Sequence, residues 1–209
     1  MSCSLFLLLS VFLFLLYCPC SKEIRTRIAL ATAAMARLTR MWRSDISFQT
    51  KYKLYRSLVV SILLYGCEAW TLHADTERRI QAFEYKCWRR LLKISYREHK
   101  TNDFVKNMVE SFVGPQEPLL ATVKYRKLKW FAHVTRHDSL CKTILQGTVE
   151  GGRRRGRPRK SWTDNIKTWT GLAAPELLAV AADRPAWRRL SASSAHRSPE
   201  RPSGHGIDV

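Results

Sequence analysis

Apolar residues recur at intervals of three and four between positions 79 and 94, and this spacing constrains the fold more than any other feature of the sequence. Ile80, Phe83, Cys87, Leu91 and Ile94 line up as one stripe along an α-helix. No stretch of the chain alternates apolar and polar residues over any length, as a half-buried β-strand does. The sequence therefore predicts an all-α fold.

Further segments carry helical patterns or helix-end signals. Residues 51–65 are apolar almost all round in their second half, which predicts a helix buried in a core and ended by Gly66. Ser161 with Asp164 predicts a capped short helix that Gly171 stops. The remaining predicted helices are residues 23–42, a helix opened by Pro118, and residues 176–191 with a break near Pro185.

Composition shifts divide the chain into five predicted parts. They are a hydrophobic segment at 1–20, a helical body at 21–146, an arginine-rich linker at 147–160, C-terminal helices at 161–191, and a polar, disordered tail at 192–209.

The net charge indicates the class of partner. Lysine and arginine number 36 against 17 acidic residues, which gives a formal charge of +19. A charge of that sign attracts polyanions, either nucleic acid or an anionic membrane surface. The simpler alternative is a basic protein whose charge only keeps it dispersed. We expect nucleic acid as the partner, contacted mainly through its backbone, and no small-molecule substrate.

The strongest local candidate is the stretch GGRRRGRPRKSW at residues 151–162. Pro158 disfavours helix and extends the preceding residue, so the arginines lie on a narrow, extended backbone. Arg155-Gly156-Arg157-Pro158 resembles the AT-hook motif, in which arginines enter the minor groove. The resemblance places Arg155 and Arg157 in the groove and the flanking cations on phosphates, namely Arg153, Arg154, Arg159 and Lys160. A nuclear-import signal and a plain solvated linker remain alternatives.

Two helical regions supply further cations. Lys124 and Lys127, interleaved with aromatic side chains, are candidates for phosphate contacts, although such aromatics more often belong to a core. On the segment around residue 87, basic residues fall mostly opposite the apolar stripe. They form either a solvated face or a surface that follows a nucleic-acid backbone, and they are Arg79, Lys86, Arg90 and Lys93.

The first residues point to a different partner. Leu5 to Tyr17 is apolar except for Ser10, which suits a cleaved signal or a short membrane anchor. The positive charges follow this run, beginning at Lys22, so an anchor would leave the body on the cytosolic side. A fortuitous reading frame is the third interpretation. The location is accordingly the membrane if the segment is used, and otherwise the nucleus or cytoplasm.

Metal and catalytic chemistry find little support in the sequence. The six cysteines form no repeated C-x-x-C pair, so buried free thiols are expected. Two of His133, His137 and Cys141 could share a metal from one helix face, but positions 133 and 141 are about 12 Å apart along a helix. Core or surface histidines are the preferred interpretation. No aspartates are paired, as two-metal nucleotidyl transfer requires. We expect no cofactor, no metal and no enzymatic activity.

Most of the chain, roughly residues 22–190, resembles the C-terminal region of reverse transcriptases from non-LTR (LINE-like) retrotransposons. Four stretches in order carry the resemblance: LYGCEAW at 64–70, RIQAFE at 79–84, WFAHV at 130–134, and the arginine run. In those enzymes this region follows the polymerase palm.

The resemblance implies a helical, thumb-like bundle with a basic tail that grips template RNA or target DNA. It does not extend to catalysis, because no residue here matches the Tyr-x-Asp-Asp active site of the palm, and no endonuclease domain is recognisable. The resulting expectation is a truncated reverse-transcriptase fragment with residual nonspecific nucleic-acid binding. The alternative is a small membrane-anchored basic protein.

Overall fold

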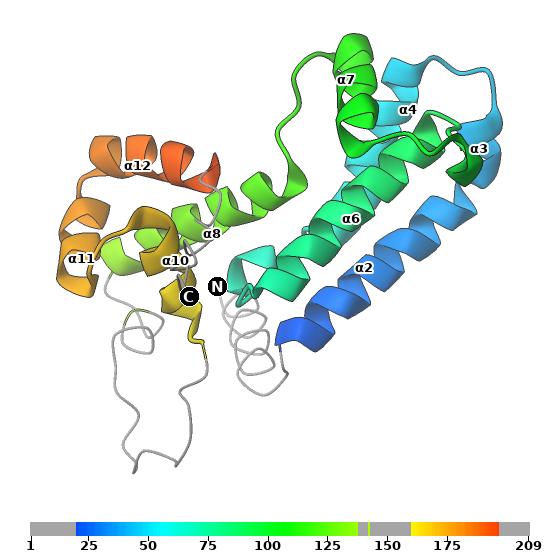
Figure 1. Cartoon of the computed structure of the whole chain (residues 1–209). Helices are drawn as coiled ribbons and strands as arrows, with labels where there is room; N and C mark the ends of the chain where they lie inside the picture. The colour runs from blue at the N-terminus through cyan, green and yellow to red at the C-terminus, as the bar shows by residue number, and fades with distance from the viewer. Residues whose placement is uncertain (1–19, 138–141, 143–159, 197–209) are drawn as a thin grey trace, which may run out of the picture. The chain divides into compact units, whose positions relative to one another are not determined.

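The computed structural model describes residues 20–137, 142 and 160–196. Helices make up the regular structure of these residues and no β-strand occurs among them, which confirms the predicted all-α fold. The chain divides into two compact units, Met1–Lys127 and Leu128–Val209. The division falls inside one long helix, α8. Figure 1 shows the helices coloured along the chain.

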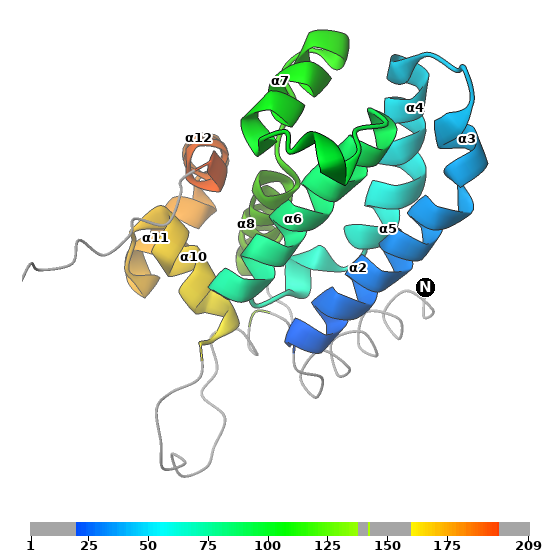
Figure 2. The same ribbon diagram turned by 45° about the vertical axis from the view of Figure 1, so that its right-hand side comes forward.

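The first unit is a bundle in which α2 and α6 run side by side (Figures 1 and 2). Its elements are α2 Cys20–Arg37, α3 Thr39–Arg43, α4 Phe48–Leu54, the π-helix η1 Tyr55–Val60, α5 Ser61–Leu63, the 3₁₀ turn η2 Cys67–Ala69, α6 Ala74–Leu91, the 3₁₀ turn η3 Tyr96–Glu98, α7 Asn102–Val113, and the first half of α8 Leu119–Arg136.

The apolar stripe predicted at residues 80–94 forms the buried face of α6. Ile80, Phe83, Cys87 and Leu91 are all buried, as their spacing predicts. Ile94 lies three residues beyond the helix and is only half-buried. Burial of apolar surface stabilises a fold by about 25 cal/mol per Å², so this stripe fixes α6 in the core.

The predicted helix at 23–42 is broken in two. The α2 helix ends at Arg37 and α3 begins at Thr39, so Leu38 stands between them. The break lets the indole of Trp42 turn inward, where it is fully buried and its Nε1–H donates to the carbonyl of Met35 at 2.9 Å.

The segment at 51–65 differs from its prediction of a helix buried almost all round. Its middle winds as a π-helix, Tyr55–Val60, with Val59 and Leu63 buried while Leu58 and Tyr65 are exposed. The prediction of all-round burial was therefore wrong, because the neighbouring helices cover only one side. Gly66 ends the segment in the left-handed conformation with φ 67°, as predicted.

The helix α7, Asn102–Val113, was not predicted. The hydroxyl of Thr101 accepts the N–H of Phe104 at 3.2 Å and so caps its first turn. Val105 and Val109 are its buried residues, and Phe104, Met108 and Phe112 repeat at the same four-residue spacing beside them. This helical periodicity is present in the sequence, so the prediction missed a helix that the pattern supports.

A buried carboxyl group joins α6 to the start of α8. Both oxygens of Glu84 accept the backbone N–H of Leu119, at 3.1 and 3.2 Å. The side chain is buried, and this burial raises its pKa to about 7, although the Leu119 N–H and the charge of Arg56 both act to lower it. Glu84 therefore fixes where α8 begins and changes charge near neutral pH.

The second unit contains the rest of α8 with α10 Trp162–Thr170, α11 Ala174–Ala182 and α12 Arg184–His196. The predicted cap is confirmed, because the Ser161 hydroxyl accepts the N–H of Asp164 and the Asp164 carboxylate accepts the N–H of Ser161. The indole of Trp187 donates to the carbonyl of Leu128 at 3.1 Å within the core of this unit.

The predicted disordered tail begins too early. Residues 192–196 continue α12, and Ser194 and Ala195 are buried against the rest of the second unit. Small residues that look like a linker in sequence are here the close-packed side of a helix. The rest of the predicted tail, 197–209, lies outside the described residues.

Candidate nucleic-acid interface

One line of α6 carries positive charge to the surface. Arg79, Lys86 and Arg90 are exposed and lie seven and four residues apart, so they share one side of the helix. The buried stripe lies about a quarter-turn away around the same helix, so the cations flank the hydrophobic core without entering it. The prediction that these cations stand apart from the apolar stripe is therefore confirmed.

The neighbouring helices α2 and α3 add cations beside this line. Arg25 is near enough to Asp75, at the start of α6, to lower the pKa of that carboxyl. At the other end, Arg90 Nη2 donates to Thr39 Oγ1 at 2.8 Å, and Lys93 Nζ donates to the carbonyl of Arg43 at 3.3 Å. The two long helices therefore run in parallel, and Arg25 and the cations of α3 lie at the edge of α6.

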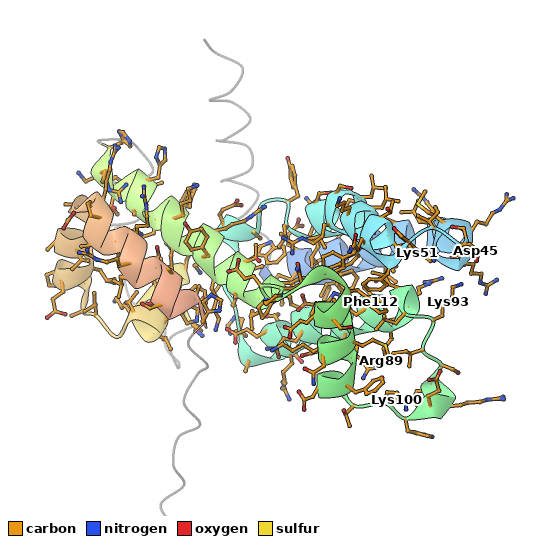
Figure 3. The ribbon with its side chains drawn as sticks, turned by 90° about the horizontal axis from the view of Figure 1, so that it is seen from above. Asp45, Lys51, Arg89, Lys93, Lys100 and Phe112 are labelled. Atoms are coloured by element: carbon orange, nitrogen blue, oxygen red, sulfur yellow. The ribbon has the colours of Figure 1, made fainter. Side chains whose placement is uncertain are left out.

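We call this surface the basic track. It comprises the exposed cations Arg25, Arg40, Arg43, Arg79, Lys86, Arg90 and Lys93. On α2, the exposed residues that continue the line of Arg25 are Ala29 and Ala36, whose methyl groups do not obstruct an approaching phosphate backbone. Lys93 lies at the end of the unit that also carries Asp45 (Figure 3).

Little negative charge opposes these cations. Of the seven cations of the track, Arg79 is the one in an ion pair with another described residue. Its partner is the carboxylate of Asp75 at 2.8 Å, and both side chains are about half exposed. The hydrogen bond from Arg79 is the main reason that the pKa of Asp75 is lowered. Exposed ion pairs of this kind contribute little to stability, so Arg79 remains free to exchange its partner for a phosphate.

The dimensions suit a polyanion. Arg79 and Arg90 are 11 residues apart, which corresponds to about 17 Å along an α-helix. Each strand of a duplex carries a phosphate about every 3.4 Å of helix axis but winds around that axis, so a straight row of this length faces a few phosphates on one side of the duplex. The track can therefore contact a few phosphates at once.

The structure removes two predicted residues from the interface. Lys124 and Lys127 are both buried, and Lys127 is 0% exposed with its Nζ donating to the carbonyl of Trp70 at 2.8 Å. A buried ammonium that serves a backbone carbonyl cannot reach a phosphate. The cations of α8 that do reach the surface are Arg126 and Lys129.

We predict that Lys127→Met destabilises the first unit by about 2 kcal/mol, because the carbonyl of Trp70 loses a buried donor while the apolar stem is kept. Urea unfolding followed by circular dichroism measures the change. Lys129→Met on the exposed side of the same helix is the matched control and should change stability by less than about 0.5 kcal/mol. Equal effects at both positions would refute a structural role specific to Lys127.

The arginine-rich stretch contributes one described residue. Lys160 is exposed just before the cap of α10, while Arg153, Arg154, Arg155, Arg157 and Arg159 lie outside the described residues. The AT-hook resemblance therefore stays a prediction. The aromatic residues of α8 pack partly on protein, since the rings of Trp130 and Trp162 meet edge-to-face with centroids 5.3 Å apart.

The remaining predictions concern metal ligands and free thiols. The rings of His133 and His137 lie with centroids 4.9 Å apart, and Cys141 lies outside the described residues. In the described part of the chain, no three histidine, cysteine or acidic side chains gather as metal ligands. Cys67 and Cys87 are buried free thiols, as predicted, and burial raises the pKa of each to about 12.

The predicted membrane segment, Leu5 to Tyr17, also lies outside the described residues. Among the helices that the structure describes, none combines the length and the apolar character needed to cross a bilayer.

Part of the interface could be read from the sequence and part could not. The cations of α6 follow from its periodicity. Arg25, Arg40 and Arg43 were not selected as candidates, because only the parallel packing of α2 and α3 against α6 brings them to the same edge. The sequence shows Arg25 and Arg40 on the predicted helix at 23–42, with Arg43 just after it. It does not show which helix packs beside these arginines.

Comparison with known proteins indicates where such a chain comes from. It is 28% identical over 148 residues to an uncharacterized transposon-derived protein of Caenorhabditis elegans, an alignment that covers 69% of this chain and 53% of the relative. The similarity points to a transposon-related origin. The chain spans about half the length of that curated relative. No family model and no solved structure matches it.

Proposed function

We propose that this chain derives from the C-terminal region of a non-LTR retrotransposon reverse transcriptase and binds nucleic acid without sequence preference. The transposon-derived relative supports the origin at the coarser level. The ordered stretches LYGCEAW, RIQAFE, WFAHV and the arginine run support the finer assignment. Polymerase activity is not part of the proposal.

The basic track is the observation that carries the binding proposal. Seven exposed cations lie along the edge shared by α2, α3 and α6, and one of them, Arg79, is ion-paired, to Asp75. Lysine and arginine contacts to phosphate release counterions from the polyanion, and this release drives association whatever the base sequence. Contacts to phosphates position a protein but read no bases, which accounts for the absence of sequence preference.

The arginine-rich stretch extends the same chemistry in the second unit. Its cations add phosphate contacts, and the Arg155-Gly156-Arg157-Pro158 motif adds a preference for narrow minor grooves when the nucleic acid is AT-rich DNA. The track and the stretch thus make separable contributions, one insensitive to sequence and the other sensitive to groove width.

A salt titration of the full chain tests the proposal. We expect the affinity for a mixed-sequence duplex to fall with a log–log slope of about −4 or steeper between about 50 and 200 mM salt, because each phosphate contact contributes about −0.9. Fluorescence anisotropy of a labelled duplex measures it. Unrelated sequences should give the same slope. Affinity that does not change with salt, or no binding at the lower salt, would show that the proposal is wrong.

A further inference from the structure

An apolar strip lies exposed on the first unit, away from the basic track. Leu58, Ile62 and Tyr65 are four and three residues apart on the segment that contains η1 and α5. Leu30 is exposed on α2 beside them. The exposed fractions are 49% for Leu30, 42% for Leu58 and 58% for Tyr65, while Ile62 is half-buried.

A cation–π contact shows that α2 and the end of the segment with η1 and α5 are adjacent at this apolar strip. The guanidinium carbon of Arg27 sits over the ring of Tyr65, 4.6 Å from its centroid. Arg27 comes one turn before Leu30 on α2, so Leu30 and Tyr65 belong to one surface. Contiguous exposed apolar surface of this kind on a folded protein marks a site that another apolar surface covers.

We propose that the N-terminal segment Leu5 to Tyr17 of the same chain covers the apolar strip. The segment is apolar at every position except Ser10. It is joined to α2 through Cys18 and Pro19 alone, and α2 begins at Cys20. Apolar side chains on both partners leave water when they pack together, which favours the contact by about 25 cal/mol per Å².

The chain can reach this position. Leu30 lies ten residues into α2, about 15 Å from Cys20 along the helix axis. The 13 residues of the segment extend over about 20 Å even as a helix, and further when extended. A proline disfavours the helical conformation at the residue before it, so a reversal of the chain at Cys18 and Pro19 is compatible with the sequence.

Covalent connection favours this occupant over a second copy of the chain. A short connection holds the segment near the strip at an effective concentration of about 1 mM or more. A second molecule is present at far lower concentration in dilute solution. The intramolecular contact therefore forms first, and it leaves the basic track uncovered, because Arg25 of the track and Leu30 of the strip are five residues apart on α2 and point in different directions.

Site-specific photocrosslinking in the full chain tests the contact. Benzoylphenylalanine replaces Tyr65, and after irradiation the crosslinked peptides of the monomer are identified by mass spectrometry. The control places the same residue at Tyr96, which is 90% exposed on a different element of the same unit. We expect crosslinks from position 65 to fall within residues 5–17, with a yield about tenfold higher than from position 96.

A second variant keeps the test decisive. Leu9→Asp with Leu13→Asp in the segment should reduce the yield from position 65 to that of the control, while nucleic-acid binding stays unchanged. Crosslinks from position 65 that join two chains, that attach to phosphatidylserine vesicles added to the sample, or that never reach residues 5–17 would each overturn the proposal. An unchanged yield in the double variant would do so as well. None of these results bears on the basic track, so this inference and the proposed function fail separately.

Discussion

Reversing two charges on the basic track, Lys86→Glu with Arg90→Glu, should weaken nucleic-acid binding by about 100-fold at low salt. Each replacement removes a phosphate contact and adds a repulsive carboxylate, and we expect about a tenfold loss for each. Both side chains are exposed on the flank of α6, beside its buried stripe and outside the core, so the fold should tolerate the change. The log–log salt slope should also become shallower by about 2.

A matched control separates a local site from net charge. Lys53→Glu on α4 with Lys106→Glu on α7 changes the charge of the chain equally, and both lysines are outside the track. We expect this control to lower affinity only a few-fold, through long-range electrostatics that salt screens. Equal losses in the two double variants would show that the bound phosphates do not follow the α2–α6 edge. Melting curves of each variant verify that the protein remains folded.

Removing the ionisable group of Glu84 should flatten the dependence of stability on pH. In the folded chain, burial raises the pKa of this carboxyl from 4.5 to about 7. Between those two values the folded state binds more protons than the unfolded state. Stability from this group is therefore fully present below pH 4.5 and is lost as pH rises through 7. The difference amounts to about 3 kcal/mol.

Glu84→Gln isolates this contribution, because the amide is neutral at every pH and its oxygen can still accept the Leu119 N–H. Urea unfolding between about pH 5 and 8 should show the wild-type chain losing about 3 kcal/mol more than the variant. Glu110→Gln, on α7 and partly exposed, is the control and should keep the wild-type pH dependence. Parallel curves for the wild-type and Glu84→Gln proteins would refute a neutral, buried carboxyl at the start of α8.

Glu84 lies among other titratable side chains in the core. Arg56 on η1 is the charged side chain that lowers its pKa. Burial is the main cause of the raised pKa of Tyr52 and of Tyr55 nearby, and the Glu84 carboxylate adds to it. The same residue lies in the RIQAFE stretch that the sequence analysis selected only as a family marker. Nothing in that stretch indicates that its glutamate is buried.

Helices with a long, clean stripe were predictable. The α6 stripe, the left-handed turn at Gly66 and the caps at Ser161 and Gly171 all appear in the structure as the sequence predicts. These features depend on interactions between residues a few positions apart, which the sequence contains directly. The α7 helix was missed although its apolar residues repeat at four-residue spacing, and the end of α12 was missed because small residues resemble a linker.

Side-chain exposure was much harder to predict than helix position. Lys124 and Lys127 look like surface cations in an aromatic, basic stretch, yet both are buried. Leu58 and Tyr65 look like core residues, yet both are exposed. A lysine with a long stem can be buried when its ammonium finds a carbonyl, as Lys127 does with Trp70.

The sequence by itself determined that this protein is helical, where its well-patterned helices lie, and that its surplus positive charge suits a polyanion. Helix formation depends on local periodicity and capping, and net charge is a simple sum, so neither needs tertiary contacts. The tertiary structure alone decided which cations share an edge, which lysines are buried and which apolar residues are left exposed. Those properties depend on which helices pack together, and packing joins residues such as Thr39 and Arg90 that lie 51 positions apart in the chain.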